Sequence, residues 1–217
     1  MKSNSELQKN VQDAIKWEPS MHAAEIGVTA KDGIITLSGT VDNYSKKINA
    51  ENAAKNVVGV KAVAEEIIVD YGHSFKKNDT EIAKEVLDAW KYNWQVPENK
   101  LKVQVEEGWV KLEGEVSWNF QKEASKNAIN HLPGVKGVTN LIKVKSQSED
   151  ILEKKSVEAS LARNWSINSN DIKVDVQQNK VKLTGKVNSI YQKEEAGRLA
   201  WNAPGVWSVD NELAVIY

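Results

Sequence analysis

An internal repeat constrains the fold of this chain more than any other feature of its sequence. One five-residue pattern occurs three times, as Ile-Thr-Leu-Ser-Gly at 35–39, Val-Lys-Leu-Glu-Gly at 110–114 and Val-Lys-Leu-Thr-Gly at 181–185. The copies are offset by 75 and then by 71 residues, and a Gly-Val pair follows each final glycine by twenty residues. The three pairs are Gly59-Val60, Gly134-Val135 and Gly205-Val206. Because the spacing between the glycines is the same in every copy, the sequence predicts three tandem copies of one small unit.

Each copy begins with the pattern of an amphipathic helix and continues with two short strands. Apolar residues at i, i+4 and i+8 predict the helix in the first two copies, and the third copy keeps only two of them, which predicts a shifted or weaker helix. These residues are Leu7, Val11 and Ile15, then Ile82, Val86 and Trp90, then Val157 and Leu161. The strands alternate apolar and polar residues, and residues able to take a positive φ join them into a hairpin. The predicted turns are Asp32-Gly33, Glu107-Gly108 and Gln178-Asn179.

A second helix and a third strand complete the unit. Asp42, Ser117 and Asn188 occupy one aligned position and are residue types that favour a helix N-cap. The Gly-Val pair is expected to end this helix and to start the third strand. A hairpin is antiparallel, and a helical crossover of this length suits a parallel pairing, so the sheet should be mixed.

We therefore predict an α+β protein of three tandem αββαβ units, each a three-stranded mixed sheet with two helices on one face. The expected boundaries are 1–72, 76–146 and 148–217. A unit of this size buries only a marginal core by itself. Intramolecular docking of the three units is therefore expected.

Composition narrows the classes of partner and the location. The chain has 29 Lys and Arg against 30 Asp and Glu, a net charge of −1, whereas a chain that neutralises many phosphates should be basic. Nucleic acid is therefore not expected as a partner. With no cysteine, disulfides and zinc–thiolate sites are excluded. No apolar run is long enough to span a membrane, and the first residues lack the apolar stretch of a signal peptide. We expect a cytoplasmic protein if Met1 is the natural start, and a periplasmic one if a leader has been removed.

The repeat resembles the BON domain, a family named for bacterial osmotically inducible and nodulation-related proteins. The resemblance lies in residues 33–41 with 59–63, in 108–116 with 134–138, and in 181–187 with 205–209. It implies an αββαβ fold, no enzymatic activity, and contact with phospholipid or another component of the cell envelope. Three units without a leader resemble the stress-associated cytoplasmic branch of the family.

The sequence offers little catalytic or metal-binding chemistry. His22, His73 and His131 fall at unrelated positions of the repeat, and no second histidine lies at ligand spacing, so solvated surface histidines are favoured. No nucleophile elbow, phosphate loop or paired-carboxylate motif is present. We therefore expect no enzyme activity, no cofactor and no metal.

Lysines and aromatic residues give the better candidates for a binding site. One aligned position near the start of the second helix is a lysine in every copy: Lys47, Lys122 and Lys193. These lysines are interpreted either as solvated side chains or as a repeated contact for an anion near the helix N-terminus. Among eight tryptophans, Trp90 aligns with core positions, and Trp109 should lie on the outer face of its sheet. The middle copy also places three candidates close together in sequence, namely Trp118, Phe120 and Lys122. These outlying aromatics could serve docking between the units, or contact with lipid or protein.

These observations lead to one preferred function and two alternatives. The first is a non-catalytic module that binds anionic phospholipid or an envelope component during osmotic or general stress, using the aromatic and lysine candidates. The alternative is a cytoplasmic protein–protein interaction scaffold, favoured by the near-neutral charge and the missing leader. The second alternative is a sensor of a small ion or metabolite, for which no loop of suitable chemistry is identifiable.

Overall fold

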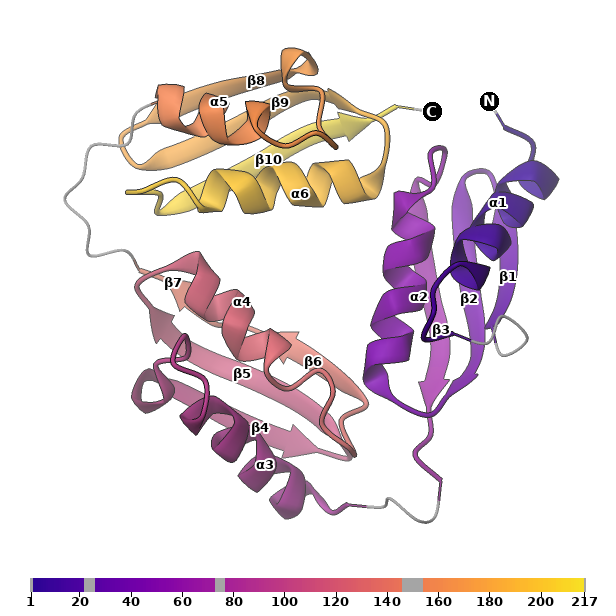
Figure 1. Cartoon of the computed structure of the whole chain (residues 1–217), viewed down its shortest axis with the longest axis vertical. Helices are drawn as coiled ribbons and strands as arrows, with labels where there is room; N and C mark the ends of the chain where they lie inside the picture. The colour runs from indigo at the N-terminus through magenta and orange to yellow at the C-terminus, as the bar shows by residue number, and fades with distance from the viewer. Residues whose placement is uncertain (1, 22–25, 73–76, 146–153, 217) are drawn as a thin grey trace. The chain divides into compact units, whose positions relative to one another are not determined.

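The computed structural model describes residues 2–21, 26–72, 77–145 and 154–216. Within them the same order of elements occurs three times (Figure 1). The first repeat consists of α1 (Asn4–Lys16), β1 (Ile26–Lys31), β2 (Ile34–Val41), α2 (Tyr44–Asn56) and β3 (Ala62–Val69). The second consists of α3 (Asp79–Lys91), β4 (Leu101–Glu106), β5 (Trp109–Val116), α4 (Asn119–Asn127), β6 (Gly137–Asn140) and β7 (Lys143–Val144). The third consists of α5 (Lys154–Ala162), β8 (Ile172–Gln177), β9 (Lys180–Val187), α6 (Ile190–Trp201) and β10 (Ser208–Val215).

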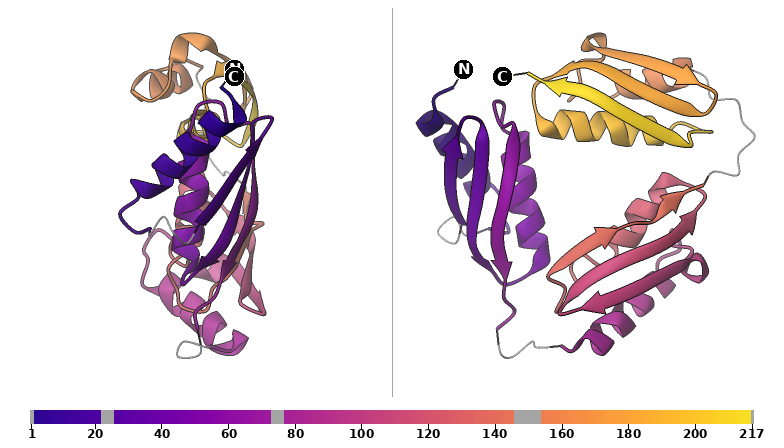
Figure 2. Two further views of the ribbon diagram at one scale, coloured as in Figure 1. Left: turned by 90° about the vertical axis from the view of Figure 1, so that its right-hand side faces the viewer. Right: turned by 180° about the vertical axis from the view of Figure 1, so that it is seen from behind.

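Each repeat has a mixed sheet, as the sequence predicts. The strand orders are β1-β2-β3, β4-β5-β6 and β10-β9-β8. In each repeat the second strand along the chain is therefore the central strand of the sheet. The hairpins β4–β5 and β8–β9 are antiparallel, whereas β5–β6 and β9–β10 are parallel. In the second repeat the third strand is interrupted, and its last part, β7, also pairs with β5. Both helices of a repeat cover one face of its sheet, and the other face is open (Figures 1 and 2).

The core of each repeat lies between the helices and the inward side chains of the central strand. Ile35 and Leu37 are fully buried, and so is Leu112 in the second repeat. The second repeat also buries Trp90 completely, as its alignment predicts, and the indole Nε1 donates to the Ser125 carbonyl oxygen at 2.9 Å. The indole therefore adds the volume of a large side chain to the core without an unpaired buried N–H.

The predicted N-caps of the second helix are wrong by one residue. Asn43 Oδ1 accepts from the backbone N–H of Lys46 at 2.9 Å, and Ser189 Oγ accepts from that of Gln192 at 3.2 Å. The capping position is thus Asn43, Trp118 and Ser189, and not Asp42, Ser117 and Asn188. Both positions carry capping residue types in two of the copies, so residue type alone could not choose between them.

In the second repeat the N-cap side chain makes no capping bond, and only the bond from the glutamine three residues later is made. Trp118 has no side-chain acceptor, and Gln121 Oε1 accepts instead from the backbone N–H groups of Ser117 and Trp118, each at 3.1 Å. This satisfies backbone donors ahead of α4 and leaves the Trp118 indole without a capping role.

A glycine within the central strand, two residues before the end of the strand, allows the chain to pass close to its neighbour. Gly114 has φ +138°, and a Cβ there would lie 2.3 Å from the Lys100 carbonyl oxygen. Gly185 repeats the arrangement, with φ +128° and a distance of 2.1 Å to the Asp171 carbonyl oxygen. A side chain at this position is therefore excluded both by the backbone conformation and by a rigid neighbour.

A carboxylate ties the end of α5 to α6 in the third repeat. Glu195 accepts from Arg198 Nε and Nη2 at 2.7 and 2.6 Å, and from Asn164 Nδ2 at 2.9 Å. The Arg198 guanidinium lowers the pKa of the Glu195 carboxyl below its ordinary value, and the Asn164 amide acts in the same direction. The ionised form of Glu195 thus fixes the turn that follows α5.

Replacing Gly114 by alanine should destabilise the second repeat by about 2–4 kcal/mol, because the Cβ meets a backbone oxygen and not a flexible side chain. Urea unfolding of the full chain, followed by circular dichroism, measures this. The matched control is Gly72→Ala, where φ is also positive at +65° but nothing lies within 4 Å of the added Cβ. The control should cost about 1 kcal/mol, which is the backbone term alone. Equal losses in the two variants would contradict the close approach.

Replacing Glu195 by glutamine should lower the free energy of unfolding by about 1 kcal/mol at neutral pH, because the Arg198 side chain is half exposed and solvent screens the pair. The folded pKa of Glu195 is lowered, so the stability it contributes is fully present above its unfolded pKa, near 4.5. That contribution is lost as the pH falls through the folded value. The difference between parent and variant should therefore shrink below about pH 4.5 in urea titrations. A difference that stays constant between pH 7 and pH 3 would contradict the assignment.

Candidate functional site

The most exposed tryptophans lie in one loop of the repeat, directly after its first helix. Trp17 is 85% exposed, Trp94 is 88% exposed and Trp165 is 97% exposed. We call these three loops the tryptophan turns. Large apolar side chains this exposed are unusual, and their recurrence at one place in every repeat indicates a shared interaction surface.

In the second and third repeats an Asx turn carries the exposed tryptophan, whereas Trp17 of the first repeat is the C-cap residue of α1. In the second repeat Asn93 Oδ1 accepts from the Gln95 backbone N–H at 3.0 Å, and in the third Asn164 Oδ1 accepts from that of Ser166 at 2.9 Å. The indole-bearing residue lies between these bonded positions, at the tip of an Asx turn. The third turn is fixed further by Gln192 Nε2, which donates to the Ser166 carbonyl oxygen at 2.7 Å.

A buried apolar residue holds each turn against the core. It lies two to four residues beyond the tryptophan, at one aligned position of the repeat. Met21, Val96 and Ile167 fill this position, and each is 7% exposed. The turn therefore inserts one apolar side chain into its own repeat and presents a neighbouring tryptophan to solvent. The exposure of the tryptophan comes from an anchored loop and not from an unpacked one.

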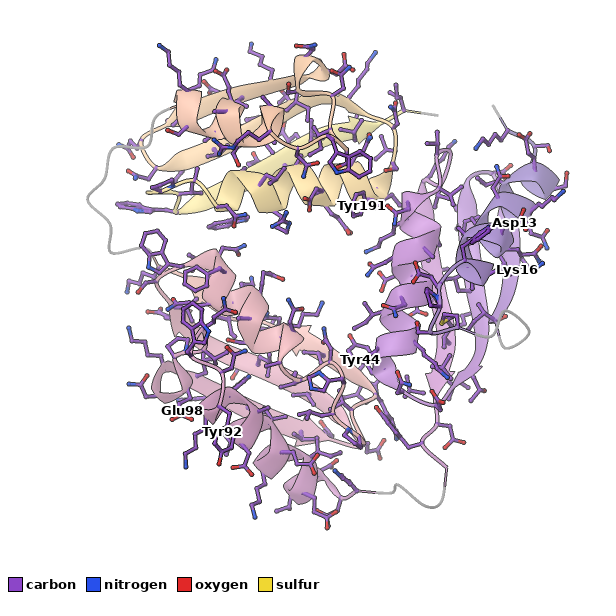
Figure 3. The ribbon with its side chains drawn as sticks, viewed as in Figure 1. Asp13, Lys16, Tyr44, Tyr92, Glu98 and Tyr191 are labelled. Carbon is purple, nitrogen blue, oxygen red and sulfur yellow. The ribbon has the colours of Figure 1, made fainter. Side chains whose placement is uncertain are left out.

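A basic side chain accompanies each tryptophan. Lys16 and Lys91 end α1 and α3, where cations favour the helix C-terminus, and Arg163 follows α5. All three are exposed. Tyr92, 84% exposed, adds a second aromatic in the middle repeat. Figure 3 labels Lys16 at the end of α1, and Tyr92 and Glu98 around the corresponding turn of the second repeat.

The site residues predicted around α4 lie at its N-terminus. Trp118 is 39% exposed at the N-cap and Phe120 is 44% exposed in the first turn. Lys122 is half-buried. Phe120 and Lys122 are two residues apart on the helix, so they do not face each other. The structure thus brings these residues to one end of α4 without a shared face for all three.

The aligned lysines take part in the packing of the second helix on the third strand. Lys47 Nζ donates to the Ile67 carbonyl oxygen at 2.7 Å, from α2 to β3. Lys122 and Lys193 accept instead through their backbone oxygens, from Asn140 Nδ2 at 3.0 Å and Asn211 Nδ2 at 2.6 Å. The position therefore joins helix to strand in all three repeats. The asparagines were not singled out from the sequence.

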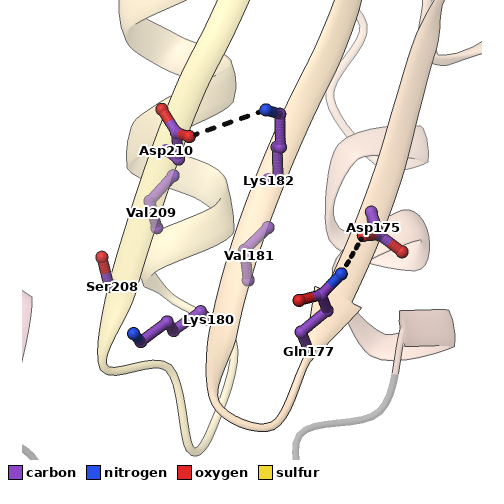
Figure 4. Close-up of a pocket in the computed structure, with 8 residues that line it drawn as sticks. All are labelled: Asp175, Gln177, Lys180, Val181, Lys182, Ser208, Val209 and Asp210. Carbon is purple, nitrogen blue, oxygen red and sulfur yellow. Dashed lines mark hydrogen bonds and ion pairs between the residues drawn. The ribbon is translucent and has the colours of Figure 1, made fainter.

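The open face of each sheet is a second candidate surface. On the sheet of the second repeat, Trp109 of β5 lies on this face and is 54% exposed, as the alternation of side chains along the strand predicts. An open hollow of about 290 Å³ adjoins it, lined by Gln104, Glu106, Trp109, Val110, Lys111 and Thr139. The third repeat has a hollow of about 630 Å³ at the same place, lined by Asp175, Gln177, Lys180, Val181, Lys182, Ser208, Val209 and Asp210 (Figure 4).

The hollow of the third repeat is charged. Lys182 Nζ lies 2.7 Å from Glu212 Oε1. Figure 4 shows two further contacts: Lys182 Nζ lies 4.0 Å from Asp210 Oδ2, and Gln177 Nε2 donates to Asp175 Oδ2 at 3.3 Å. The hydrogen bond to Glu212 raises the pKa of the Lys182 ammonium. Lys182 is thus paired with carboxylates, and the hollow contains charges of both signs.

The described residues offer no metal site: nowhere among them do three or more His, Asp or Glu side chains gather as ligands. His131 is exposed, whereas His22 and His73 lie outside the described residues. Within the same part of the chain, no helix combines the length and the apolar character needed to cross a bilayer.

The tryptophan turns were missed in the sequence, although the repeat contains a signal for them. The offset of 71 aligns Trp94 with Trp165, and the offsets of 75 and 71 align Met21, Val96 and Ile167. Trp17 lies one residue before the turn position that Asn93 and Asn164 share, so alignment by identity does not bring all three tryptophans together.

Comparison with known proteins identifies the repeat. The model of the BON domain matches residues 3–71, 78–146 and 150–217. The chain is 27% identical over 146 residues to osmotically-inducible protein Y of Escherichia coli (strain K12), covering 65% of this chain and 73% of that protein.

Two solved structures of CdsD, a structural protein of the type III secretion system of Chlamydia trachomatis, are also similar. Each is 17% identical; the first covers 96% of this chain and 91% of the other, with a TM-score of 0.28, and the second covers both chains fully, with a TM-score of 0.27. Those scores carry no structural argument. The three family matches span nearly all of the sequence, and the chain belongs to the BON domain family.

Proposed function

We propose that this chain is a non-catalytic binding protein that attaches to anionic phospholipid surfaces through its three tryptophan turns. The observation that carries the proposal is the recurrence, in every repeat, of an almost fully exposed tryptophan one to three residues after an exposed cation. Indole rings favour the headgroup level of a bilayer, and neighbouring basic side chains add attraction to anionic lipid.

A phospholipid surface can be bound through three weak contacts, one from each tryptophan turn. A single exposed indole gives only marginal attachment, but linked sites raise the overall affinity without any new contact, provided that they can engage together. A bilayer presents the same headgroups everywhere, so it can meet identical turns on different repeats. A compact protein partner would need matching sites in triplicate.

The name of the similar protein supports a setting for this function. That relative is called osmotically inducible. We infer that the present chain acts in osmotic or general stress, when the state of the envelope changes, and that it does so by binding and not by catalysis.

Removing the turn tryptophans should abolish vesicle binding. In co-sedimentation with vesicles of phosphatidylglycerol and phosphatidylcholine, single Trp17→Ala, Trp94→Ala and Trp165→Ala variants should each weaken binding by up to about tenfold, and the triple variant should not bind. The fold should be unchanged, because the three side chains are exposed.

The matched control for this experiment is Trp118→Ala with Lys122→Ala, which alters an aromatic and a cation outside the turns. It should bind vesicles as the parent does. If the control loses binding and the triple variant keeps it, the site is the N-terminus of α4. If the parent binds no vesicle, the phospholipid function is wrong.

The accompanying cations should govern the salt dependence. Each lysine or arginine close to an anionic membrane contributes about 1 kcal/mol at low ionic strength. Changing Lys16, Lys91 and Arg163 to glutamine should therefore weaken binding to anionic vesicles and flatten its dependence on salt. Binding to pure phosphatidylcholine should be unaffected. An unchanged salt dependence would show that these cations do not contact the lipid.

A further inference from the structure

The hollow on the open sheet face has the same position in the second and third repeats but a different lining. By the offset of 71 residues, Trp109 corresponds to Lys180, and Gly137, which pairs with Trp109 across β5 and β6, corresponds to Ser208. In the first repeat the same positions hold Ile34 and Ala62. The middle repeat alone combines the largest side chain at one position with the smallest at the other.

This combination sets the orientation of the indole. Trp109 and Gly137 are partners in the parallel pairing of β5 with β6. A Cβ on Gly137 would lie 2.2 Å from Trp109 Cζ3 and 2.5 Å from Cε3, so the ring lies directly over the glycine. One side of the indole thus rests on β6, and 54% of the residue remains exposed to solvent. The tryptophans of the turns project from the chain, whereas this ring lies along the sheet.

Polar groups surround the ring at the edge of the hollow. The side chains of Gln104, Glu106 and Thr139 line it and make no hydrogen bond within the described part of the chain. Lys111 Nζ lies 2.7 Å from Glu113 Oε1, and this bond lowers the pKa of the Glu113 carboxyl. An amide, a carboxylate and a hydroxyl are therefore available to a ligand that rests on the indole.

We propose that this platform on the second repeat binds a neutral pyranose sugar. A pyranose ring with equatorial substituents has a flat C–H face that packs on an indole, while its hydroxyls reach amide, carboxylate and hydroxyl groups around the ring. A hollow of about 290 Å³ lies at the lower end of ligand sites, about 300–1,000 Å³, and suits one sugar unit of a longer chain. Nucleobases stack on similar sheets, but the Glu106 carboxylate, on the residue paired with Trp109 across β4 and β5, repels the phosphates that accompany them.

The test is titration of the full chain with cellotetraose and with tetra-N-acetylchitotetraose, followed by tryptophan emission and by calorimetry. Both probes have equatorial linkages and flat C–H faces. We expect saturable binding with a dissociation constant on the order of 0.1–1 mM. Trp109→Ile, which installs the residue of the first repeat, should weaken binding at least tenfold.

Gly137→Ala separates the platform from a structural effect. Gly137 has no positive φ, so alanine suits its strand, but the added Cβ occupies the position of the ring and must displace it. Binding should fall about tenfold while the unfolding midpoint stays near that of the parent. Gln104→Ala should weaken binding by a few-fold through loss of one hydrogen bond.

The outcomes separate this proposal from phospholipid binding. Trp109→Ile should bind anionic vesicles as the parent does, and the triple variant of the tryptophan turns should still bind the sugars. Absence of saturable binding to both oligosaccharides would overturn the proposal. Equal affinity in the parent and in Gly137→Ala would overturn the role of the flat indole. Binding of a single-stranded oligonucleotide in place of the sugars would assign the platform to nucleobases and overturn the proposed ligand.

Discussion

The central strand of each repeat is the element on which the rest of the structure depends. Its inward side chains, such as Ile35 and Leu37 of β2, are completely buried beneath the two helices. Its backbone pairs with a hairpin partner on one side and with the crossover strand on the other. Because side chains alternate between faces, every second residue of this strand is committed to the core and every other residue is free of it. The outward positions can therefore hold isoleucine, tryptophan or lysine, as residues 34, 109 and 180 do, without any change of fold.

In the tryptophan turns, too, residues close together in sequence divide between the core and the solvent. Within two to four residues one side chain enters the core and a neighbour is presented to solvent. The buried residue holds the backbone of each turn, and in the second and third repeats an Asx hydrogen bond holds it as well, so the backbone that carries the exposed indole is already ordered. Rigid presentation of this kind favours binding, because less ordering remains to be done when a ligand arrives.

The sequence predicted the structure best where the same pattern of residues occurs in all three copies of the repeat. The order of elements, the mixed pairing and the burial of Trp90 followed from apolar periodicity and from the spacing of the glycines. The N-cap was misplaced because Asp42 and Asn43 are both capping types, and the choice depends on where the chain leaves the strand. The turns escaped notice because Trp17 is displaced by two residues from the position that Trp94 and Trp165 share. The orientation of Trp109 over Gly137 is a cross-strand relationship, which depends on the register of β5 and β6 and not on neighbours in the sequence.

The two candidate surfaces differ in a way that bears on their ligands. The turns are repeated, with an indole and a cation in every unit, whereas the open sheet faces have diverged from one repeat to the next. A ligand that is itself a repeating surface can use identical contacts in each unit, and such contacts gain from multiplicity. A discrete ligand needs one site with its own arrangement of polar groups, and nothing requires that site in triplicate. The repeated turns thus suit an extended lipid surface, and the single combination of Trp109 with Gly137 suits a discrete ligand. Duplication of a stable core has allowed both kinds of surface on one chain, because neither uses the residues that hold the core together.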